Sequence, residues 1–253
     1  MQIFQPTILR FDSIDSTNLE AMRQARAGAP EGLCVVAREQ LHGRGRLDRS
    51  WQSPKDAGLY FSIVLRPQLA LNSWPLITLM TALAGADALL KSCGLRADIK
   101  WPNDICFDDR KLGGILAETV ETNAGAAAIV GVGINLNADG LSPTLRDRAT
   151  TVEALTGRKP DGELLLEKLV RALGERYELL QSLDGCEHTI REWCANSSYA
   201  MGRQVRISLD QETFEGTTRG LESDGALRVE TSAGKIRIVR AGDVTAVRAF
   251  SRQ

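Results

Sequence analysis

Residues 43–51 combine arginines with glycines, and this combination suits the binding of an anion. The stretch reads GRGRLDRSW, so Arg44, Arg46 and Arg49 fall within six residues. A guanidinium group can form two parallel hydrogen bonds with a phosphate or a carboxylate, and glycine lets the backbone approach a ligand closely. Trp51 adds an apolar face for a ring or a chain. From the spacing alone, an anion site and a solvated basic loop that contacts nucleic acid are equally good interpretations.

Three further segments place polar residues or glycines in apolar surroundings. The run KWPND at 100–104 must bend the chain, because proline cannot donate to a central strand ladder; in isolation it is most simply a surface turn. Lys111 stands just before two glycines and an apolar strand, where it could meet a phosphate or a developing negative charge, or simply end a turn and face water. The glycines of GVGINLN at 131–137 indicate either a ligand or backbone passing close, or tight packing alone.

The elements that must position these segments are predicted from hydrophobic periodicity and from turn residues. Ser16 or Thr17 can cap a helix over 19–28 that Gly28 ends. Segments 33–40 and 58–67 are rich in β-branched and aromatic residues and are predicted to be strands. The polar connection between them, residues 42–58, has seventeen residues, and connections of that length inside a compact domain are usually functional.

Residues 74–92 form a strongly apolar, buried helix in this interpretation, and further helices are expected over 161–181 and 186–196. Residues 97–107 and 112–121 are predicted to be two strands joined by a turn at 108–111, and 126–137 a further apolar strand. From about Tyr199 onwards, short alternating segments separated by glycines indicate a small β-barrel or sandwich. The sequence therefore predicts an α/β (α+β) part, a boundary near residue 198 and a small all-β part.

The composition excludes several classes of protein. The 253 residues include 31 basic and 32 acidic side chains, a formal net charge of −1, which argues against attachment to nucleic acid or anionic membranes by bulk charge. Five cysteines without a C-x-x-C pair and only two histidines make a disulfide framework, a structural zinc site or a histidine-rich metal site improbable. No basic and apolar leader and no run of about 18 apolar residues occur. We expect a cytoplasmic protein without a membrane span.

Taken together and in this order, five blocks resemble the biotin–protein ligase family, the biotin–[acetyl-CoA-carboxylase] ligases. The blocks are STN at 16–18, the GRGR…R-x-W loop, KWPND, K-x-x-GIL-x-E from Lys111 and G-x-GIN-x-N from Gly131. The resemblance is dense over residues 10–137 and weaker beyond them. It implies a class II aminoacyl-tRNA synthetase-like mixed sheet with flanking helices in residues 1–198, as a catalytic domain for biotin and ATP. Residues 199–253 would form an SH3-like C-terminal barrel.

The resemblance also implies a reaction in two steps. The biotin carboxylate attacks the α-phosphorus of ATP to give biotinyl-5′-AMP, and a lysine of a biotin carboxyl carrier protein then attacks this anhydride. Three residues would be catalytic: Lys111 on the biotin carboxylate and α-phosphate, Arg46 on the adenylate phosphate, and Arg44 on the reactive intermediate. ATP and Mg²⁺ would be required, with the metal on the phosphates. Asp104 would help hold Mg²⁺ or orient the incoming lysine.

Two sets of binding residues follow from the same blocks. For biotin they are Ser16, Thr17, Asn18, Gln40, Gly43, Arg44, Gly114, Ile115 and Leu116. For the nucleotide they are Arg46, Arg49, Trp51, Asn103, Lys111 and Asn135, with Trp51 against the adenine. Two positions depart from the family pattern. Asp48 stands where the family often has glycine, and we expect it to pair with a neighbouring arginine. Arg248 falls one position late in the G-[DE]-[IV]-S-x-R ending, which leaves its contact with ATP open.

The expected partners are biotin, ATP and a biotin carboxyl carrier domain. We expect neither DNA nor a membrane, and a monofunctional ligase, because the first block begins only sixteen residues from the start. A homodimer stays open, with strand 126–137 as the candidate sheet edge. The alternatives are a lipoate or octanoate–protein ligase of the same fold, a non-catalytic biotin-binding protein, and a nucleic-acid-binding protein. The near-zero charge and the 5% aromatic content disfavour the last of these.

Overall fold

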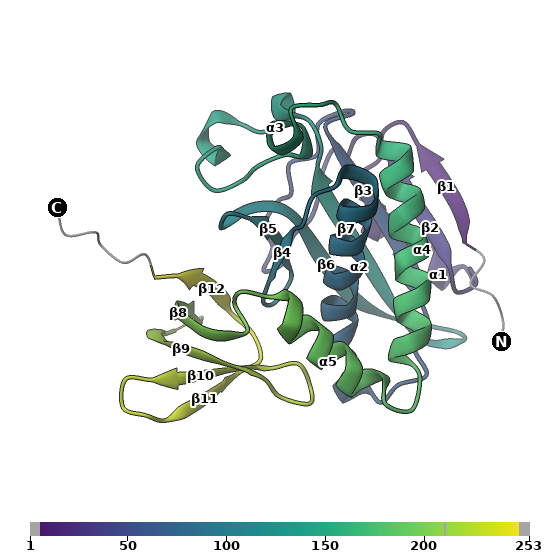
Figure 1. The fold of residues 1–253 in the computed structure, drawn as a ribbon. Helices are drawn as coiled ribbons and strands as arrows, with labels where there is room; N and C mark the ends of the chain where they lie inside the picture. Colours follow the sequence, from purple (N-terminus) through teal and green to yellow (C-terminus); the bar gives the residue numbers. More distant parts are fainter. Residues whose placement is uncertain (1–5, 210, 248–253) are drawn as a thin grey trace.

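A large mixed sheet flanked by helices and a smaller antiparallel sheet make up the computed structural model, which describes residues 6–209 and 211–247 (Figure 1). The large sheet has the strand order β1-β2-β3-β7-β6-β5-β4. β1 pairs with β2 in parallel, and the other neighbours are antiparallel. The seven strands are Thr7–Phe11, Leu33–Ala37, Gly58–Leu65, Asp98–Lys100, Asp104–Phe107, Arg110–Thr122 and Gly125–Asn135. The predicted mixed sheet with flanking helices is confirmed.

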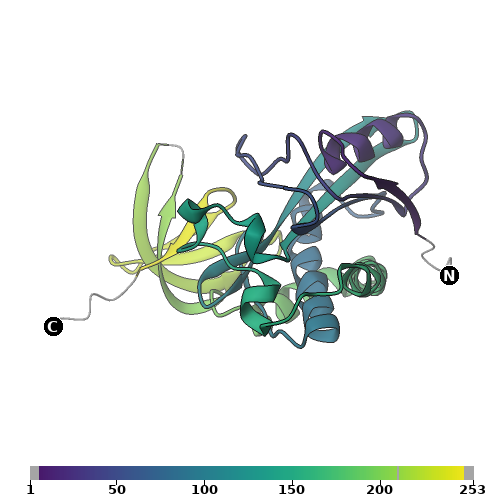
Figure 2. The same cartoon turned by 90° about the horizontal axis from the view of Figure 1, so that it is seen from above.

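Helices cover both faces of this sheet, as Figure 2 shows from above. On one face α1 (Thr17–Arg26) buries Ala21 and Ala25 in a small apolar cluster with residues of β2, β3, β6 and β7. On the other face α2 (Pro75–Cys93) and α4 (Gly162–Leu180) pack against each other, and α5 (Gly185–Asn196) packs on α2. The short α3 spans Val152–Thr156. The predicted helices therefore lie within one or two residues of their expected bounds.

The apolar helix α2 lies in the main hydrophobic core. It is long and apolar enough to cross a membrane by length and composition alone, yet 61% of its most apolar window is buried in this fold. It begins with Pro75 in its first turn and ends at Gly94, which has a φ of 70°. Proline suits a first turn, and glycine readily adopts a left-handed helix end. Burial among protein side chains is typical of a core helix.

The expected strand over residues 97–107 is interrupted by its Trp-Pro-Asn-Asp run. The chain forms β4, turns at Trp101–Asn103 with a cis Trp101–Pro102 peptide, and returns antiparallel as β5. The hairpin from β5 to β6 turns at Asp108 and Asp109, with φ values of 49° and 61°. Arg110 and Lys111 lie in β6, not in the turn where we expected them. A two-residue hairpin turn with two positive φ values accounts for this shorter connection.

The expectation that strand 126–137 is a sheet edge is wrong. β7 pairs with β3 on one side and with β6 on the other. Its run AAAIVGVG is almost continuously apolar and buried, and such runs are typical of strands that are covered on both faces. Residues 128–135 of this strand therefore cannot pair with a strand of a second copy, and a homodimer by another surface stays a prediction.

The C-terminal sheet begins soon after α5 and has the strand order β11-β10-β9-β8-β12. Its strands are Met201–Ser208, Thr213–Leu221, Leu227–Thr231, Ile236–Val239 and Asp243–Ala246. Val205, Ile207, Leu227 and Val229 are buried and belong to the same apolar cluster as α2. The predicted small all-β part is therefore present, and its core is continuous with the main one. Arg248 lies outside the described residues.

Candidate active site

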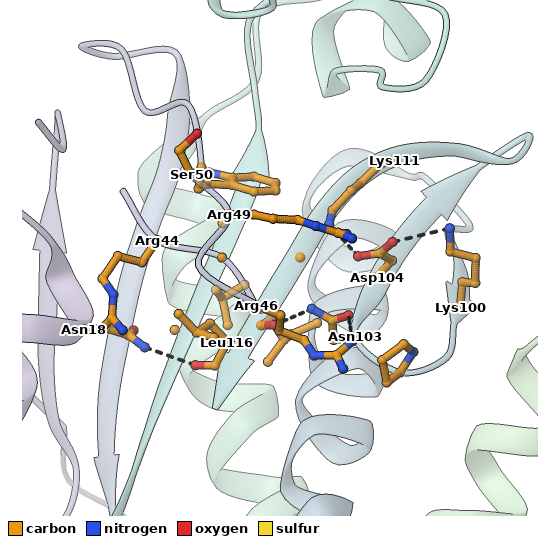
Figure 3. Close-up of a pocket in the computed structure, with 18 of the residues that line it drawn as sticks. Asn18, Arg44, Arg46, Arg49, Ser50, Lys100, Asn103, Asp104, Lys111 and Leu116 are labelled. Atoms are coloured by element: carbon orange, nitrogen blue, oxygen red, sulfur yellow. Dashed lines mark hydrogen bonds and ion pairs between the residues drawn. The ribbon is translucent and has the colours of Figure 1, made fainter. Parts of the chain in front are cut away.

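A cavity of about 280 Å³ lies over the middle of the large sheet and reaches β12 of the C-terminal sheet (Figure 3). Its wall includes residues from the start of α1, the arginine loop, the turn after β4, β6, β7 and β12. Most of the site residues predicted from the sequence meet here: Ser16, Thr17, Asn18, Gln40, Arg44, Arg46, Arg49, Trp51, Asn103, Asp104, Lys111, Gly114, Ile115 and Leu116. The fold thus brings five separate sequence blocks to one cavity.

Two lysines share one carboxylate on the cavity wall. The Lys111 Nζ lies 2.5 Å from the Asp104 Oδ1, and the Lys100 Nζ lies 3.3 Å from the Asp104 Oδ2 (Figure 3). Lys100 and Asp104 are mostly buried, with 17% and 16% of their side chains exposed. Lys111 also lies over the ring of Trp51, with its Nζ 5.3 Å from the ring centroid. The cluster has two positive charges for one negative charge, so it favours an anionic ligand.

The three arginines of the loop have different partners. Arg44 forms an ion pair with Glu118 at 3.0 Å, and Arg49 forms one with Asp243 of β12. The Arg46 Nη1 donates to the Asn103 Oδ1 at 3.3 Å and to the Gly242 carbonyl at 3.4 Å. Burial lowers the pKa of Arg46 below its usual value, although arginine stays charged in proteins. Asp243 and Asp104 act on this charge from nearby, but its hydrogen bonds go to neutral groups, so it is well suited to receive a phosphate.

The tip of the arginine loop adopts a tight turn of its own. Leu47 and Asp48 have φ values of 53° and 55°, and the Gly45 amide donates to the Arg49 carbonyl at 2.7 Å. Aspartate tolerates this left-handed conformation better than most residues do, which explains how Asp48 replaces the glycine common in the family. Among the described residues Asp48 forms no ion pair, so the expected pairing with an arginine is not seen.

Neutral polar groups line the opposite end of the cavity. The Gln40 Oε1 accepts from the Thr17 amide at 2.8 Å and from its hydroxyl at 3.0 Å. The Ser62 Oγ lies 2.7 Å from the Thr17 Oγ1 and 2.6 Å from the Asn18 Oδ1. The Asn18 amide donates to the Leu116 carbonyl at 3.1 Å. These groups are held in place by one another, and so they present fixed donors and acceptors to a neutral polar ligand.

Glycines form the floor of the cavity because side chains lie directly on it. A Cβ added at Gly133 would fall 2.6 Å from the Trp51 Cε2, and one at Gly131 would fall 2.2 Å from the Asn18 Oδ1. The indole nitrogen of Trp51 is buried and has no hydrogen-bond partner among the described residues. The glycines in this strand therefore let these side chains pack tightly on it, which is the second of the two interpretations that the sequence left open; the close passage of a ligand stays a prediction.

Two predicted site residues, Asn135 and Gly43, are not among the described residues that line this cavity. The Asn135 amide donates to the Thr150 carbonyl at 3.1 Å and to that of Lys111 at 3.4 Å, so it supports the strand that bears Lys111. The Gly43 carbonyl accepts from the Trp51 amide at 2.8 Å and closes the base of the arginine loop.

Several residues of the wall were missed in the sequence. They are Gly45, Ser50, Phe61, Lys100, Trp101, Pro102, Gly131, Val132, Gly133, Asp243, Val244 and Thr245. Lys100 belongs to the KWPND block, and this membership could have identified it. Asp243, Val244 and Thr245 of β12 belong to the segment that resembles the G-[DE]-[IV]-S-x-R ending, but only Arg248 was considered there.

Comparisons with known proteins identify the class to which this fold and cavity belong. Residues 10–135 match the Biotin/lipoate A/B protein ligase family, and residues 200–245 match the Biotin protein ligase C terminal domain. The biotin--[acetyl-CoA-carboxylase] ligase of Paracoccus denitrificans is 33% identical over 91% of this chain and 96% of its own length. The bifunctional ligase/repressor BirA of Bacillus spizizenii is 34% identical, over 91% of this chain and 71% of its own length.

A solved structure agrees with these sequence matches. The biotin protein ligase from Aquifex aeolicus in complex with biotin and ATP superposes with a TM-score of 0.82 at 28% identity, over 96% of this chain and 99% of that one. The chain belongs to the biotin protein ligase family and is an enzyme of the ligase class.

Proposed function

We propose that this chain activates biotin with ATP as biotinyl-5′-AMP and transfers it to a lysine of a biotin carboxyl carrier protein. The observation that carries the proposal is one cavity with a neutral polar end and a cationic end. Thr17 and Gln40 lie at the first, and Arg46 and Lys111 at the second. A substrate with a neutral ring and an anionic tail fits this polarity.

The neutral end suits the ureido ring of biotin, which has two N–H donors and one carbonyl acceptor. Ser16 is 1% exposed, and its hydroxyl forms no cap hydrogen bond with α1, so it is available to a ligand. Thr17 is held by Gln40. A buried site built to hydrogen-bond its ligand discriminates strongly against ligands that lack the matching groups.

The cationic end offsets the repulsion between a carboxylate and the phosphates of ATP. Lys111 and Arg46 would stabilise the negative charge that develops at the α-phosphorus, since both reach the cavity from strand and loop positions fixed by hydrogen bonds. Removal of one such preorganised donor typically costs about 10²–10³ in rate. Arg44 would leave its ion pair with Glu118 and then hold the intermediate.

Mg²⁺ would enter with the phosphates of ATP. In residues 6–209 and 211–247, no group of three or more His, Cys, Asp or Glu side chains is placed to hold a metal ion. Both oxygens of Asp104 are engaged by lysines. When bound, the metal would neutralise phosphate charge and orient the triphosphate, and Asp104 would contribute only after it releases a lysine.

The arginine loop has to move when the nucleotide binds. The cavity volume of about 280 Å³ lies just below the range of ligand cavities, about 300–1,000 Å³, and Trp51 lies across its floor. Displacement of the indole would open room for adenine and give the ring a stacking partner. Closure of the loop over the adenylate would exclude water from the anhydride. We place the reaction in the cytoplasm, where ATP is available.

The test is biotin-dependent ATP–pyrophosphate exchange with Mg²⁺, run beside lipoate and octanoate. We expect exchange with biotin alone and a loss of about 10²–10³ in Lys111→Ala. Lys168→Ala is the matched control, because this lysine of α4 pairs with Glu167 outside the cavity. Exchange with lipoate or octanoate instead would move the protein to the sister activity. Biotin binding without exchange would refute the catalytic proposal.

A further inference from the structure

Lys100 is the second cation on the carboxylate that holds Lys111. It faces Asp104 across the β4–β5 pair, where the two residues are register partners. Each oxygen of Asp104 has its own ammonium group, at 2.5 Å from Lys111 and 3.3 Å from Lys100. The proposed function gives Lys111 a role on phosphate but leaves Lys100 without one.

The ammonium group of Lys100 also contacts Tyr199, which lies between α5 and β8. Its Nζ lies 5.9 Å from the ring centroid of Tyr199, and Tyr199 is 2% exposed. The Tyr199 hydroxyl donates to the Asp109 Oδ1 at 2.6 Å, and the Arg203 Nη2 binds both oxygens of Asp109 at 2.8 and 2.7 Å. The same buried tyrosine thus contacts both the turn before Lys111 and the ammonium of Lys100.

The second cation matters because the proposed reaction would remove Lys111 from the Asp104 carboxylate. If Lys111 is to bind a phosphate, it must leave Asp104. A carboxylate with only 16% of its side chain exposed would then lose a partner, and a partly buried unpaired charge is costly. Because Lys100 stays beside the carboxylate, Asp104 keeps a cationic partner when Lys111 leaves.

We propose that Lys100 is a positioning residue that retains Asp104 while Lys111 transfers to the phosphate. This inference rests on the proposed function, because it assumes that Lys111 acts on ATP. Lys100 acts through Asp104 and not by its own contact with the nucleotide. Without Lys100, Asp104 would have Lys111 as its remaining cation and would hold it away from the substrate.

The test is a double-mutant cycle on the kcat of biotin-dependent pyrophosphate exchange. We expect Lys100→Met to lower kcat about tenfold, within the range of coupling between neighbouring charged groups. It should leave the KM for biotin unchanged, since Lys100 lies on the opposite side of the cavity from Asn18 at its neutral end (Figure 3). In the Asp104→Asn background, where no carboxylate retains Lys111, the same substitution should change kcat less than about twofold. Lys100→Arg should restore most of the rate.

Lys168→Met is the matched control for the loss of a lysine paired to a carboxylate. Equal losses from Lys100→Met in both backgrounds would overturn the inference, because a direct contact with the nucleotide or a general loss of folding does not depend on Asp104. A thermal unfolding midpoint that falls in Lys100→Met but not in Lys100→Arg, with a parallel loss in both backgrounds, would also overturn it. Absence of exchange in the unsubstituted protein would instead refute the proposed function, and the inference with it.

Discussion

Substitution of Gly133 by alanine isolates the role of the glycine floor of the cavity. Gly133 is paired on both sides, with Tyr60 of β3 and Gly114 of β6, so the backbone cannot yield. A new Cβ would meet the Trp51 Cε2, Nε1 and Cζ2 at 2.6, 2.7 and 2.9 Å. All three distances are too short for real contacts, and the indole must leave the floor.

The cost follows from the surface that the indole then exposes. A fully buried tryptophan removes about 150–250 Å² from water, and Trp51 is half-buried, so about 100 Å² is exposed. At about 25 cal/mol/Å² this costs about 2.5 kcal/mol. Loss of the contact with the Lys111 ammonium adds about 0.5 kcal/mol. Alanine in place of glycine returns about 0.5–1 kcal/mol, so the free energy of unfolding should fall by about 2 kcal/mol.

Urea unfolding of four proteins measures this value: the unsubstituted chain, Gly133→Ala, Trp51→Ala and the double variant. Gly133→Ala should be neutral or slightly stabilising once Trp51 is absent. Gly114→Ala is the matched control, because its Cβ would meet the flexible Lys111 Cε at 3.0 Å and the Trp51 Cζ3 at 3.4 Å; it should cost less than about 1 kcal/mol. An equal cost of Gly133→Ala with and without Trp51 would refute the reasoning.

Two further predictions concern buried groups outside the cavity floor. Tyr199→Phe and Tyr177→Phe each remove a 2.6 Å hydrogen bond from a buried tyrosine to a carboxylate. Each should lower the free energy of unfolding by about 1.5–3 kcal/mol. Only Tyr199→Phe should lower the kcat of exchange, and equal kinetic effects of the two substitutions would show that the Tyr199 contact is merely structural. Burial raises the pKa of Cys34 and of Cys106 from 9.0 to about 12, so the unfolded chain loses these protons first. Their contribution to stability is therefore complete below pH 9 and is lost as the pH rises from 9 to 12. Urea midpoints at pH 8 and pH 10.5 should show this fall. Burial also raises the pKa values of Tyr60, Tyr177 and Tyr199, so a Cys34→Ala, Cys106→Ala double variant should keep only part of the fall, and an undiminished fall would contradict the assignment.

Much of the fold was predictable because its elements carry strong local signals. The apolar helix α2 and the amphipathic helix α4 occur where their periodicity indicates, and Gly94 and Asp161 mark one end of each. The strand boundaries near Trp101 were wrong because a short run with proline can reverse a chain within the same sheet. β7 was misplaced at an edge because periodicity reports burial but not which neighbours a strand has.

The candidate site was predictable where its residues fall in contiguous blocks. Arg46, Trp51 and Lys111 all come to the cavity wall. The sharing of Asp104 between two lysines was not predictable, because it depends on the register of β4 with β5 and on a bulge between β5 and β6. Ser62 was missed because a lone hydroxyl in an apolar strand gives no sign of which buried partners it meets.

The contribution of β12 makes completion of the cavity a late event during synthesis of the chain. Arg46 and the Gly242 carbonyl that it contacts are 196 residues apart, and domains generally fold in the order in which they leave the ribosome. The strands of the large sheet are all present once Asn135 has emerged, yet the wall at Asp243–Thr245 is still untranslated. A translation product that stalls before β12 would therefore have the neutral polar end and the cationic side chains, but its cationic end would lack the wall formed by Asp243–Thr245.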